Sequence, residues 1–213
     1  MPSPSRTPSR SWPTPTVTSR PSCRSRSRTR QGRAVTLTAE HGISDLCKQF
    51  VAGQLAHAPA IYALLAPTVN CLKRRRTHTF SPTNVSWGLE DRSAFVRIKG
   101  GSVASRHVEN RAPTAISNPY LAGAAILGAG ILGIEDELVL EPPAASPAEE
   151  DASKTPLPTS VRESLEALAV DEKLGDLLGD EFVAAYTTMR RYELRRFDDH
   201  VTDWEFDEYV EIH

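Results

Sequence analysis

The stretch that decides the predicted fold is NVSWGLEDRSAFVRIKGGSVASRHVENR, residues 84–111. Within it, the side chains of residues 93–99 alternate between two faces, as in a β-strand. The glycine pair at 100–101 is a hairpin signal, and residues 105–111 can form the returning strand. Another strand is expected at 84–87, followed by a turn. The stretch therefore predicts antiparallel strands joined by short connections.

Charged side chains gather on or near this predicted hairpin. The set comprises Arg74, Arg92, Arg97, Glu109 and Arg111. Antiparallel pairing places Arg97 beside the strand face that carries His107, Glu109 and Arg111. Guanidinium groups on one face repel each other unless an anion lies between them, and arginine binds phosphate or carboxylate in a fork geometry. A single carboxylate among them is suited to Mg²⁺ bridging to phosphate oxygens. The pattern predicts phosphoryl transfer, and the alternative is an exposed strand face of solvated charges.

Capping residues and apolar spacing predict helices around these strands. Ser44 can cap a helix that ends before Pro59, and Pro59 fits the first turn of a second helix that runs through Leu65. Ser160 and Glu163 form a predicted capping box. Apolar side chains expected on buried faces are Leu46, Phe50, Leu55, Val161, Leu165, Leu168, Phe182, Tyr186 and Met189, and the aromatic segment 204–209 is expected to dock. The predicted fold class is α+β, with antiparallel strands packed against helices.

The apolar run YLAGAAILGAGILGI, residues 120–134, follows Asn118 and Pro119, which suit a helix cap and a first helical position. A bilayer span needs about 20 residues, so we interpret this run as a buried helix and expect no membrane partner. Its small side chains, Ala122, Gly123, Ala125, Gly128 and Gly130, permit close packing against another backbone. The 3 cysteines form no CxxC pair, and no secretory signal is visible, so a reducing cytoplasm is expected.

The net charge of −2 over 213 residues hides an asymmetry between two parts of the chain. Residues 1–34 contain eight arginines and no acidic side chain, so the remainder carries a balance of −10. Segments rich in Arg, Ser and Pro bury too little apolar surface to fold. We predict a disordered tail at 1–36 and one domain at 37–213. Phosphate-backbone binding, an organelle transit peptide and phosphorylation are alternative readings of the tail, and a nucleic-acid partner is not expected.

From Gly42 onward, the chain resembles the last half of the catalytic domain of the glutamine synthetase family. The resemblance rests on DLCKQFVAGQLAHAPAIYALLAPTVNCLKR, NVSWGLEDRSAFVRI and RHVENRAPTAISNPYLAGAAILGAGILGIE, and on the closing DWEFDEYVEI. The order and spacing of KR, RSA, RI, ExR and NPYLA are far more specific together than any of them alone.

The resemblance implies a role for each matched charged residue. Arg74 corresponds to the arginine that holds the glutamate substrate, and Arg92 to the catalytic arginine that stabilises the γ-glutamyl phosphate. Arg97 is similar to a nucleotide-phosphate contact, and Glu109 to the carboxylate that holds the metal nearest the ATP phosphates. Arg111 is similar to the arginine that binds the substrate carboxylate and the transferred phosphoryl group. His107 lies where the family often has a nucleotide-contacting arginine, and a neutral imidazole would bind phosphate less strongly.

The implied activity is that of a ligase of nitrogen metabolism and glutamine biosynthesis, with ATP and Mg²⁺ or Mn²⁺ as cofactors. Glutamate is phosphorylated on its side chain and then attacked by ammonia or an amine. The family also forms large homo-oligomers. Phe80 stands where the family has the ammonium-site glutamate, so an amine that carries carbon is an alternative nucleophile, with His78 as a weak base. As a bland alternative, Phe80 and His107 each merely pack or face solvent.

Other catalytic elements of the family have no counterpart in this sequence. Its ExE strand, two further metal glutamates and HxH segment lie upstream of the matched region, where residues 1–41 offer only Glu40 and His41. Several carboxylates are needed to hold two or three divalent cations. We therefore expect a truncated fragment that turns over negligibly alone. The alternative is a non-catalytic oligomerising or regulatory module that retains the fold without complete metal sites.

Overall fold

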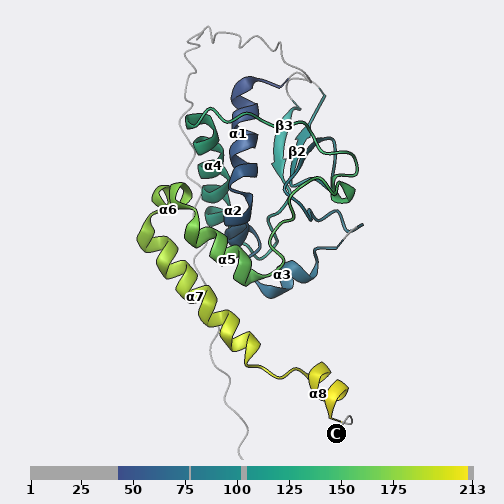
Figure 1. The fold of residues 1–213 in the computed structure, drawn as a ribbon, viewed down its shortest axis with the longest axis vertical. Helices are drawn as coiled ribbons and strands as arrows, with labels where there is room; N and C mark the ends of the chain where they lie inside the picture. The colour runs from purple at the N-terminus through teal and green to yellow at the C-terminus, as the bar shows by residue number, and fades with distance from the viewer. Residues whose placement is uncertain (1–42, 77, 102–104, 211–213) are drawn as a thin grey trace, which may run out of the picture. The chain divides into compact units, whose positions relative to one another are not determined.

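The computed structural model describes residues 43–76, 78–101 and 105–210, so the predicted tail at 1–36 lies outside the described residues (Figure 1). The described part is α+β, as predicted. In chain order its elements are α1 (Asp45–Ala56), α2 (Ala58–Leu65), α3 (Val69–Lys73), β1 (Trp87–Leu89), β2 (Val96–Lys99), β3 (His107–Asn110), α4 (Pro119–Glu135), the short 3₁₀ helix η2 (Ala148–Glu150), α5 (Val161–Val170), α6 (Glu172–Leu178), α7 (Asp180–Asp198) and α8 (Asp203–Tyr209).

The three strands form one sheet in the order β1-β2-β3. Strands β2 and β3 are antiparallel, and Arg97 lies opposite Glu109, which confirms the predicted hairpin. Strand β1 is parallel to β2, so the sheet is mixed and the prediction of antiparallel strands throughout was wrong. The first strand also begins later than predicted, because Asn84 pairs with Pro156 and the Val85 N–H donates to the Thr155 carbonyl. Residues 155–157 thus pair with the backbone at residues 84–85, which was expected to start this strand.

Helices α1 and α4 lie side by side and pack through glycine (Figure 1). A Cβ on Gly133 would lie 2.5 Å from the Cα of Gly53, and one on Gly130 would overlap the ring of Phe50. Gly123, by contrast, has open space around it. Close backbone packing along α4 is therefore confirmed, and the contact extends to Gly133, beyond the predicted set.

One face of α4 is exposed, so its expected complete burial was wrong. Leu127 and Ile131 are 57% and 45% exposed, and Tyr120 is 85% exposed. No helix in the described ranges is long and apolar enough to cross a membrane.

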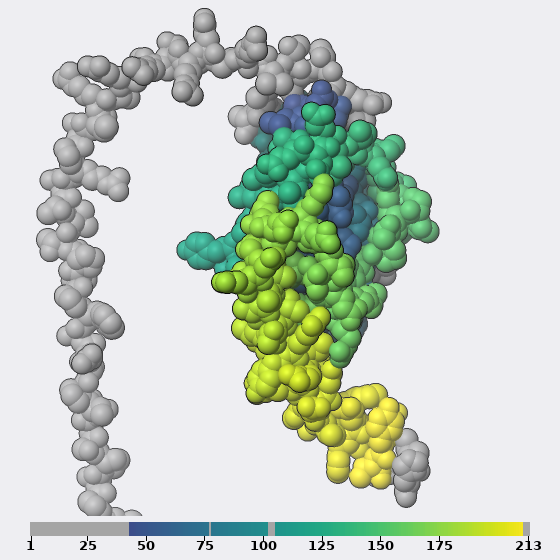
Figure 2. Space-filling view, turned by 60° about the vertical axis from the view of Figure 1, so that its left-hand side comes forward, coloured from purple at the N-terminus to yellow at the C-terminus, as the bar shows by residue number. Residues whose placement is uncertain are grey.

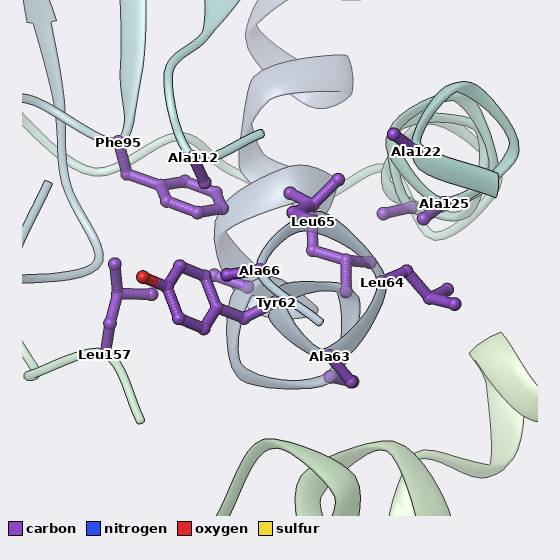
Figure 3. Close-up of a cluster of buried hydrophobic side chains, with 14 of the residues drawn as sticks. Tyr62, Ala63, Leu64, Leu65, Ala66, Phe95, Ala112, Ala122, Ala125 and Leu157 are labelled. Atoms are coloured by element: carbon purple, nitrogen blue, oxygen red, sulfur yellow. The ribbon is translucent and has the colours of Figure 1, made fainter. Parts of the chain in front are cut away.

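The core is centred on α2, whose side chains are almost all buried (Figure 3). Tyr62 and Leu65 contribute to a cluster with Phe95, directly before β2, and Leu157 from the segment before α5 (Figure 3). Helices α4 and α5 pack against α2 from further sides. The core therefore joins the helices to the sheet edge that carries the charged residues.

Three helix caps occur where the sequence predicted them. The side chains of Ser44, Asn118 and Ser160 each accept a hydrogen bond from a backbone N–H of the following turn. The capping box at α5 is incomplete, because the carboxylate of Glu163 accepts from Thr159 rather than from the cap residue. On α1 the buried face is centred on Val51–Gln54, and the expected burial of Leu46 was wrong because its side chain is 59% exposed.

The first half of helix α7 packs on the core, and its last turn contacts other segments through the Asp198–Arg162 ion pair and through Phe197, over whose ring Lys73 lies. The Tyr186 hydroxyl donates to the Ala63 carbonyl at 2.8 Å, and the Tyr186 ring stacks on Phe182. Met189, which was expected on the buried face, is 46% exposed.

The aromatic C-terminal segment was expected to dock, and this was wrong. Helix α8 has no buried residue, and Trp204 and Phe206 are 64% and 61% exposed. Figure 2 shows this segment in yellow beyond the end of α7.

Candidate active site

Glu109 lies at the centre of the charged cluster on β2 and β3. Its Oε2 accepts a hydrogen bond from Arg97 Nη1 at 3.2 Å, and its Oε1 accepts one from Arg111 Nη1 at 2.7 Å. The strand register produces this geometry, because Arg97 lies directly opposite Glu109 and Arg111 follows two residues later on the same side. The Glu109 side chain is 37% exposed and those of the two arginines 13% and 18%. The cluster is therefore an accessible patch with closely held guanidinium groups.

A second carboxylate, Glu90, holds Arg97 from its other side. Glu90 Oε2 accepts from Arg97 Nη2 at 2.6 Å, and Oε1 accepts from the Gly100 N–H at 2.8 Å. The hydrogen bond from Arg97, followed by that from Gly100, lowers the pKa of Glu90. The same hydrogen bond to Glu90 raises the pKa of Arg97. Arg97 is thus fixed as a cation between two carboxylates.

Arg111 connects three separate segments of the chain. Besides Glu109, its Nε donates to the Arg92 carbonyl at 2.6 Å and its Nη2 donates to the Phe80 carbonyl at 3.4 Å. Arg92 and Arg111 were predicted to lie in one site. In the structure they are in contact, because Arg111 donates a hydrogen bond to the backbone carbonyl of Arg92. The Arg92 side chain is exposed.

Arg74 lies next to this group, and His107 stands apart from it. Arg74 Nη2 lies 3.5 Å from the carbonyls of both Ala112 and Pro113, directly after Arg111 in the chain. His107 is exposed, and its Nδ1 lies 2.8 Å from the Ser105 carbonyl, while its partner across the hairpin is Lys99. Of the predicted site residues, Arg74, Arg92, Arg97, Glu109 and Arg111 are brought together, and His107 instead contacts Ser105 and lies opposite Lys99.

The turn at residues 78–80 approaches the cluster with an uncommon backbone. His78 and Phe80 have φ values of 65° and 56°, in the left-handed region that few non-glycine residues adopt. The His78 N–H donates to both oxygens of Glu149, at 3.1 Å each. The Phe80 side chain is 60% exposed, while its carbonyl contacts Arg111.

Asp91 is a buried carboxylate that anchors the connection carrying Arg92. Its Oδ1 accepts from the N–H and hydroxyl of Ser93 at 2.8 and 2.7 Å, and its Oδ2 accepts from the Ala148 N–H at 2.9 Å. Burial alone would raise the pKa of Asp91, but the hydrogen bonds from Ser93 and Ala148 outweigh it, and the pKa lies below its ordinary value. Asp91 is therefore held ionised beside the arginine cluster.

Three acidic residues of this region were not predicted from the sequence. Glu90 and Asp91 directly precede Arg92 in an expected turn, so acids adjoining an arginine motif were an available signal. Glu149 lies 57 residues after Arg92 (149 − 92), in an acidic proline-rich loop. Nothing in its spacing pointed to this site.

The described residues do not by themselves fit a divalent metal. In the described part of the chain, no group of three or more His, Cys, Asp or Glu side chains could hold a metal ion. Both oxygens of Glu109 already accept hydrogen bonds from arginine. What the cluster offers is positive charge in a fork geometry, which is suited to phosphate or carboxylate.

A groove of about 450 Å³ lies elsewhere on the protein, between the start of α1, Trp87 and residues 137–143. None of the residues that line it belongs to the arginine cluster. Its apolar and acidic lining does not suit a triphosphate.

Comparison with known proteins links this geometry to one family. A family model described as the glutamine synthetase catalytic domain matches residues 28–209. Gamma-glutamylethanolamide synthetase GlnA4 of Streptomyces coelicolor is 40% identical over 164 residues, which cover 77% of this chain and 35% of that protein. A glutamine synthetase of Methanococcus voltae is 32% identical over 179 residues, or 81% of this chain and 40% of that protein.

The fold is similar to that of GmaS. The ligand-free GmaS structure has a TM-score of 0.72 and 31% identity, covering 81% of this chain and 40% of the other. The GmaS/ADP complex also has a TM-score of 0.72, at 30% identity over 81% of this chain. The chain therefore spans 35% to 41% of the length of these proteins. The domain boundary at residue 36 stays a prediction.

Proposed function

The chain belongs to the glutamine synthetase family, and from this we propose that it is the C-terminal part of the catalytic domain of an ATP-dependent ligase that joins ammonia or an amine to the side chain of glutamate. The observation that carries the proposal is the convergence of Arg97 and Arg111 on Glu109, with Arg74 and Arg92 beside them. Such a cluster concentrates positive charge where a phosphoryl group and a carboxylate would meet.

Each arginine would neutralise a different part of the reacting group. Arg97 would contact the nucleotide phosphates, and Arg111 would bind the transferred phosphoryl group and the substrate carboxylate. Arg74 would hold glutamate, and the exposed Arg92 guanidinium would stabilise the γ-glutamyl phosphate. Phosphoryl transfer depends on this kind of positioning and charge neutralisation. His107 would contribute at most a weak nucleotide contact, since it lies apart from the cluster.

The proposed reaction has two steps. A carboxylate oxygen of the glutamate side chain attacks the γ-phosphorus of ATP, and ADP leaves. The nitrogen nucleophile then attacks the acyl carbon, the C–O bond to phosphate breaks, and the nitrogen loses a proton to give the amide. The divalent metal that the family uses is not assigned to residues of this chain, because Glu109 alone cannot complete its coordination. Glu109 instead sets the spacing of Arg97 and Arg111.

Phe80 supports an amine that carries carbon as the nucleophile. Its ring is 60% exposed and stands where the family has the glutamate that binds ammonium. A phenyl ring cannot accept a proton from ammonium, but it can pack against an alkyl group. The name of the S. coelicolor relative, a gamma-glutamylethanolamide synthetase, fits this choice. His78, whose side chain is 78% exposed, is the proposed weak base.

ATP binding tests the proposal. We expect the purified chain to bind ATP in isothermal titration calorimetry with Mg²⁺ present, and R97A to weaken this binding. R191A is the matched control, because Arg191 is an exposed arginine on α7 outside the cluster. An absence of heat at millimolar ATP would contradict the ligase assignment. It would favour the alternative, a non-catalytic oligomerising or regulatory module.

Turnover tests the expectation that this chain alone is nearly inactive. We expect negligible γ-glutamyl amide from glutamate, ATP and either ammonia or ethanolamine, because no group of three or more His, Cys, Asp or Glu side chains among the described residues could hold the divalent metal that the family uses. Product that E109A abolishes would contradict this. We further propose a cytoplasmic location, in keeping with the free thiols of Cys47 and Cys71. We also propose assembly as a homo-oligomer in the whole protein.

A further inference from the structure

Glu149 is a buried carboxylate that holds backbone rather than a cation. Its side chain is only 6% exposed, and both its oxygens accept from the His78 N–H at 3.1 Å. The His78 ring nitrogen Nδ1 is further away, at 3.7 Å, on a side chain that is mostly in solvent. No lysine or arginine within the described ranges forms an ion pair with Glu149. The desolvated charge is thus directed at the amide of the 78–80 turn.

That turn needs external support. Two of its three residues, His78 and Phe80, occupy the left-handed region, which costs free energy for side chains other than glycine. Locally, the Thr79 hydroxyl donates to the carbonyls of Arg74 and Arg76. At its ends the turn depends on other segments, because Glu149 accepts from His78 and Arg111 donates to the Phe80 carbonyl.

The far side of Glu149 connects to the segment that carries Arg92. The Glu149 N–H donates to Ser93 Oγ at 3.3 Å, and that hydroxyl donates to Asp91 at 2.7 Å. Asp91 also accepts from the Ala148 N–H in the same 3₁₀ helix. Arg92 lies between Asp91 and Ser93, and its carbonyl accepts a hydrogen bond from Arg111 Nε at 2.6 Å.

These contacts form a closed ring. From Arg111 it passes to the Phe80 carbonyl, along the turn to the His78 N–H, through Glu149 to Ser93, and back to Arg111 through the Arg92 carbonyl. In a closed ring each link restricts the others, so that a break at one point loosens groups on the opposite side.

We propose that Glu149 is a positioning residue that holds the nucleophile-site turn in register with Arg92 and Arg111. The proposal rests on the proposed function in one respect, namely that the turn carrying Phe80 receives the amine and the two arginines receive the phosphoryl group. Glu149 itself contacts no reacting atom. It acts through the backbone of residue 78 and the hydroxyl of Ser93.

Hydrogen exchange measured by ¹⁵N NMR on the full chain tests the ring. In E149A we expect exchange of the His78 amide to accelerate about tenfold or more, because its acceptor is lost and the turn opens locally. We also expect faster exchange at Arg111 Nε–H, on the opposite side of the ring. E149Q keeps one acceptor oxygen and should restore part of the protection. E150A is the control, because Glu150 is exposed in the same 3₁₀ helix.

The outcomes separate the two proposals. Unchanged exchange at His78 or at Arg111 Nε in folded E149A, or an equal effect of E150A, would overturn the role of Glu149. If E149A does not fold, E149Q decides, since it should give intermediate exchange at both positions, and wild-type rates there would overturn the ring. ATP binding by the wild-type chain is measured in parallel. A protected ring without ATP binding would remove the proposed function and leave the ring of hydrogen bonds in place.

Discussion

Glu109 accepts one hydrogen bond from each of two arginines, and this arrangement controls the charge available to a ligand. With Glu90 also bound to Arg97, two carboxylates offset two guanidinium groups before any anion binds. A phosphate that enters the cluster must therefore compete with Glu109 for Arg97 and Arg111. The carboxylate keeps the arginines close together at the expense of some anion affinity.

Replacing Glu109 by Gln is therefore expected to raise the affinity for inorganic phosphate, measured without divalent metal. Removal of the charge frees Arg97 and Arg111, and we expect an increase of about threefold to tenfold, with unfolding about 1 kcal/mol easier because charge-assisted hydrogen bonds are weakened. Calorimetric titration gives the first quantity and urea unfolding the second. E150Q, outside the cluster, should change neither, and weaker phosphate binding in E109Q would contradict the interpretation.

At the scale of elements, α1 and α4 pack backbone against backbone. The helices approach so closely at Gly53 and Gly133 that neither position has room for a methyl group. Glycine disfavours a helix by about 1 kcal/mol relative to alanine, so its presence here reflects packing rather than local preference.

G133A is expected to lower the free energy of unfolding by about 3 kcal/mol or more, because the added Cβ meets the backbone of α1 and not a movable side chain. The matched control is G123A on the same helix, where the methyl meets nothing and should stabilise the chain by up to about 1 kcal/mol. Urea unfolding monitored by circular dichroism measures both. Equal effects at the two positions would show that the helices are not packed backbone to backbone.

A partly buried hydrogen bond between a histidine and an aspartate joins two helix junctions. His57, between α1 and α2, has its Nδ1 2.6 Å from Oδ2 of Asp171, which caps α6. Burial would raise the pKa of Asp171, but the hydrogen bonds from His57 and Leu174 outweigh it and hold the pKa below its ordinary value of 3.8. Because the pKa of Asp171 is lower in the folded chain than in the unfolded chain, its carboxylate stabilises the fold at pH values above the ordinary pKa. That contribution is lost as the pH falls through the lowered pKa.

D171N should therefore lower the free energy of unfolding near pH 6 by about 2 kcal/mol. It should also make stability less dependent on pH below 4, the region where the wild type loses the contribution of Asp171. D176N, an exposed substitution on the same helix, is the control. Thermal unfolding from pH 3 to 7 measures both effects, and an unchanged acid limb in D171N would count against the pair.

Local signals in the sequence predicted the elements well. Side chains that cap helices act within one turn, so Ser44, Asn118 and Ser160 could be identified as caps without tertiary information. Alternation and a glycine pair similarly predicted the β2–β3 hairpin and placed Arg97 beside the strand face that carries Glu109, and the observed register sets the two residues opposite each other.

Contacts between distant segments could not be predicted in this way. Strand β1 runs parallel to β2 because the short segment between them, which carries Glu90 and Asp91, returns the chain to the level at which β1 began. No pattern in the sequence indicates that path. The link from Glu149 to the 78–80 turn spans 71 residues and depends on the fold as a whole. The arginines of the site and Glu109 could be predicted from the sequence, but Glu90, Asp91 and Glu149, which hold the surrounding segments in place, could not.

At the scale of the whole molecule, large apolar side chains remain exposed on three helices. Examples are Leu127 on α4, Tyr192 on α7 and Trp204 on α8. Exposed apolar patches of this kind mark surfaces that other protein covers. The chain also spans only 35% to 41% of the length of the relatives described above.

The double variant W204S/F206S should reduce self-association and dye binding while leaving stability almost unchanged. Both side chains are more than 60% exposed, so their removal gives up little buried surface in the chain itself. Sedimentation velocity and fluorescence of an apolar dye measure the first effect, and urea unfolding measures the second. A loss of more than about 1 kcal/mol would mean that these side chains pack on their own chain after all.

The bond from the Tyr186 hydroxyl to the Ala63 carbonyl has a mechanical consequence. Beyond Tyr186, helix α7 exposes Met189, Tyr192 and Phe197, and α8 buries nothing. A pulling force applied at the C-terminal end, as in an optical trap, would break the exposed Asp198–Arg162 ion pair and the Lys73–Phe197 contact and peel these turns away at low load. The load would then reach Tyr186, whose ring and hydroxyl clamp the helix to α2, and rupture of the body would begin there.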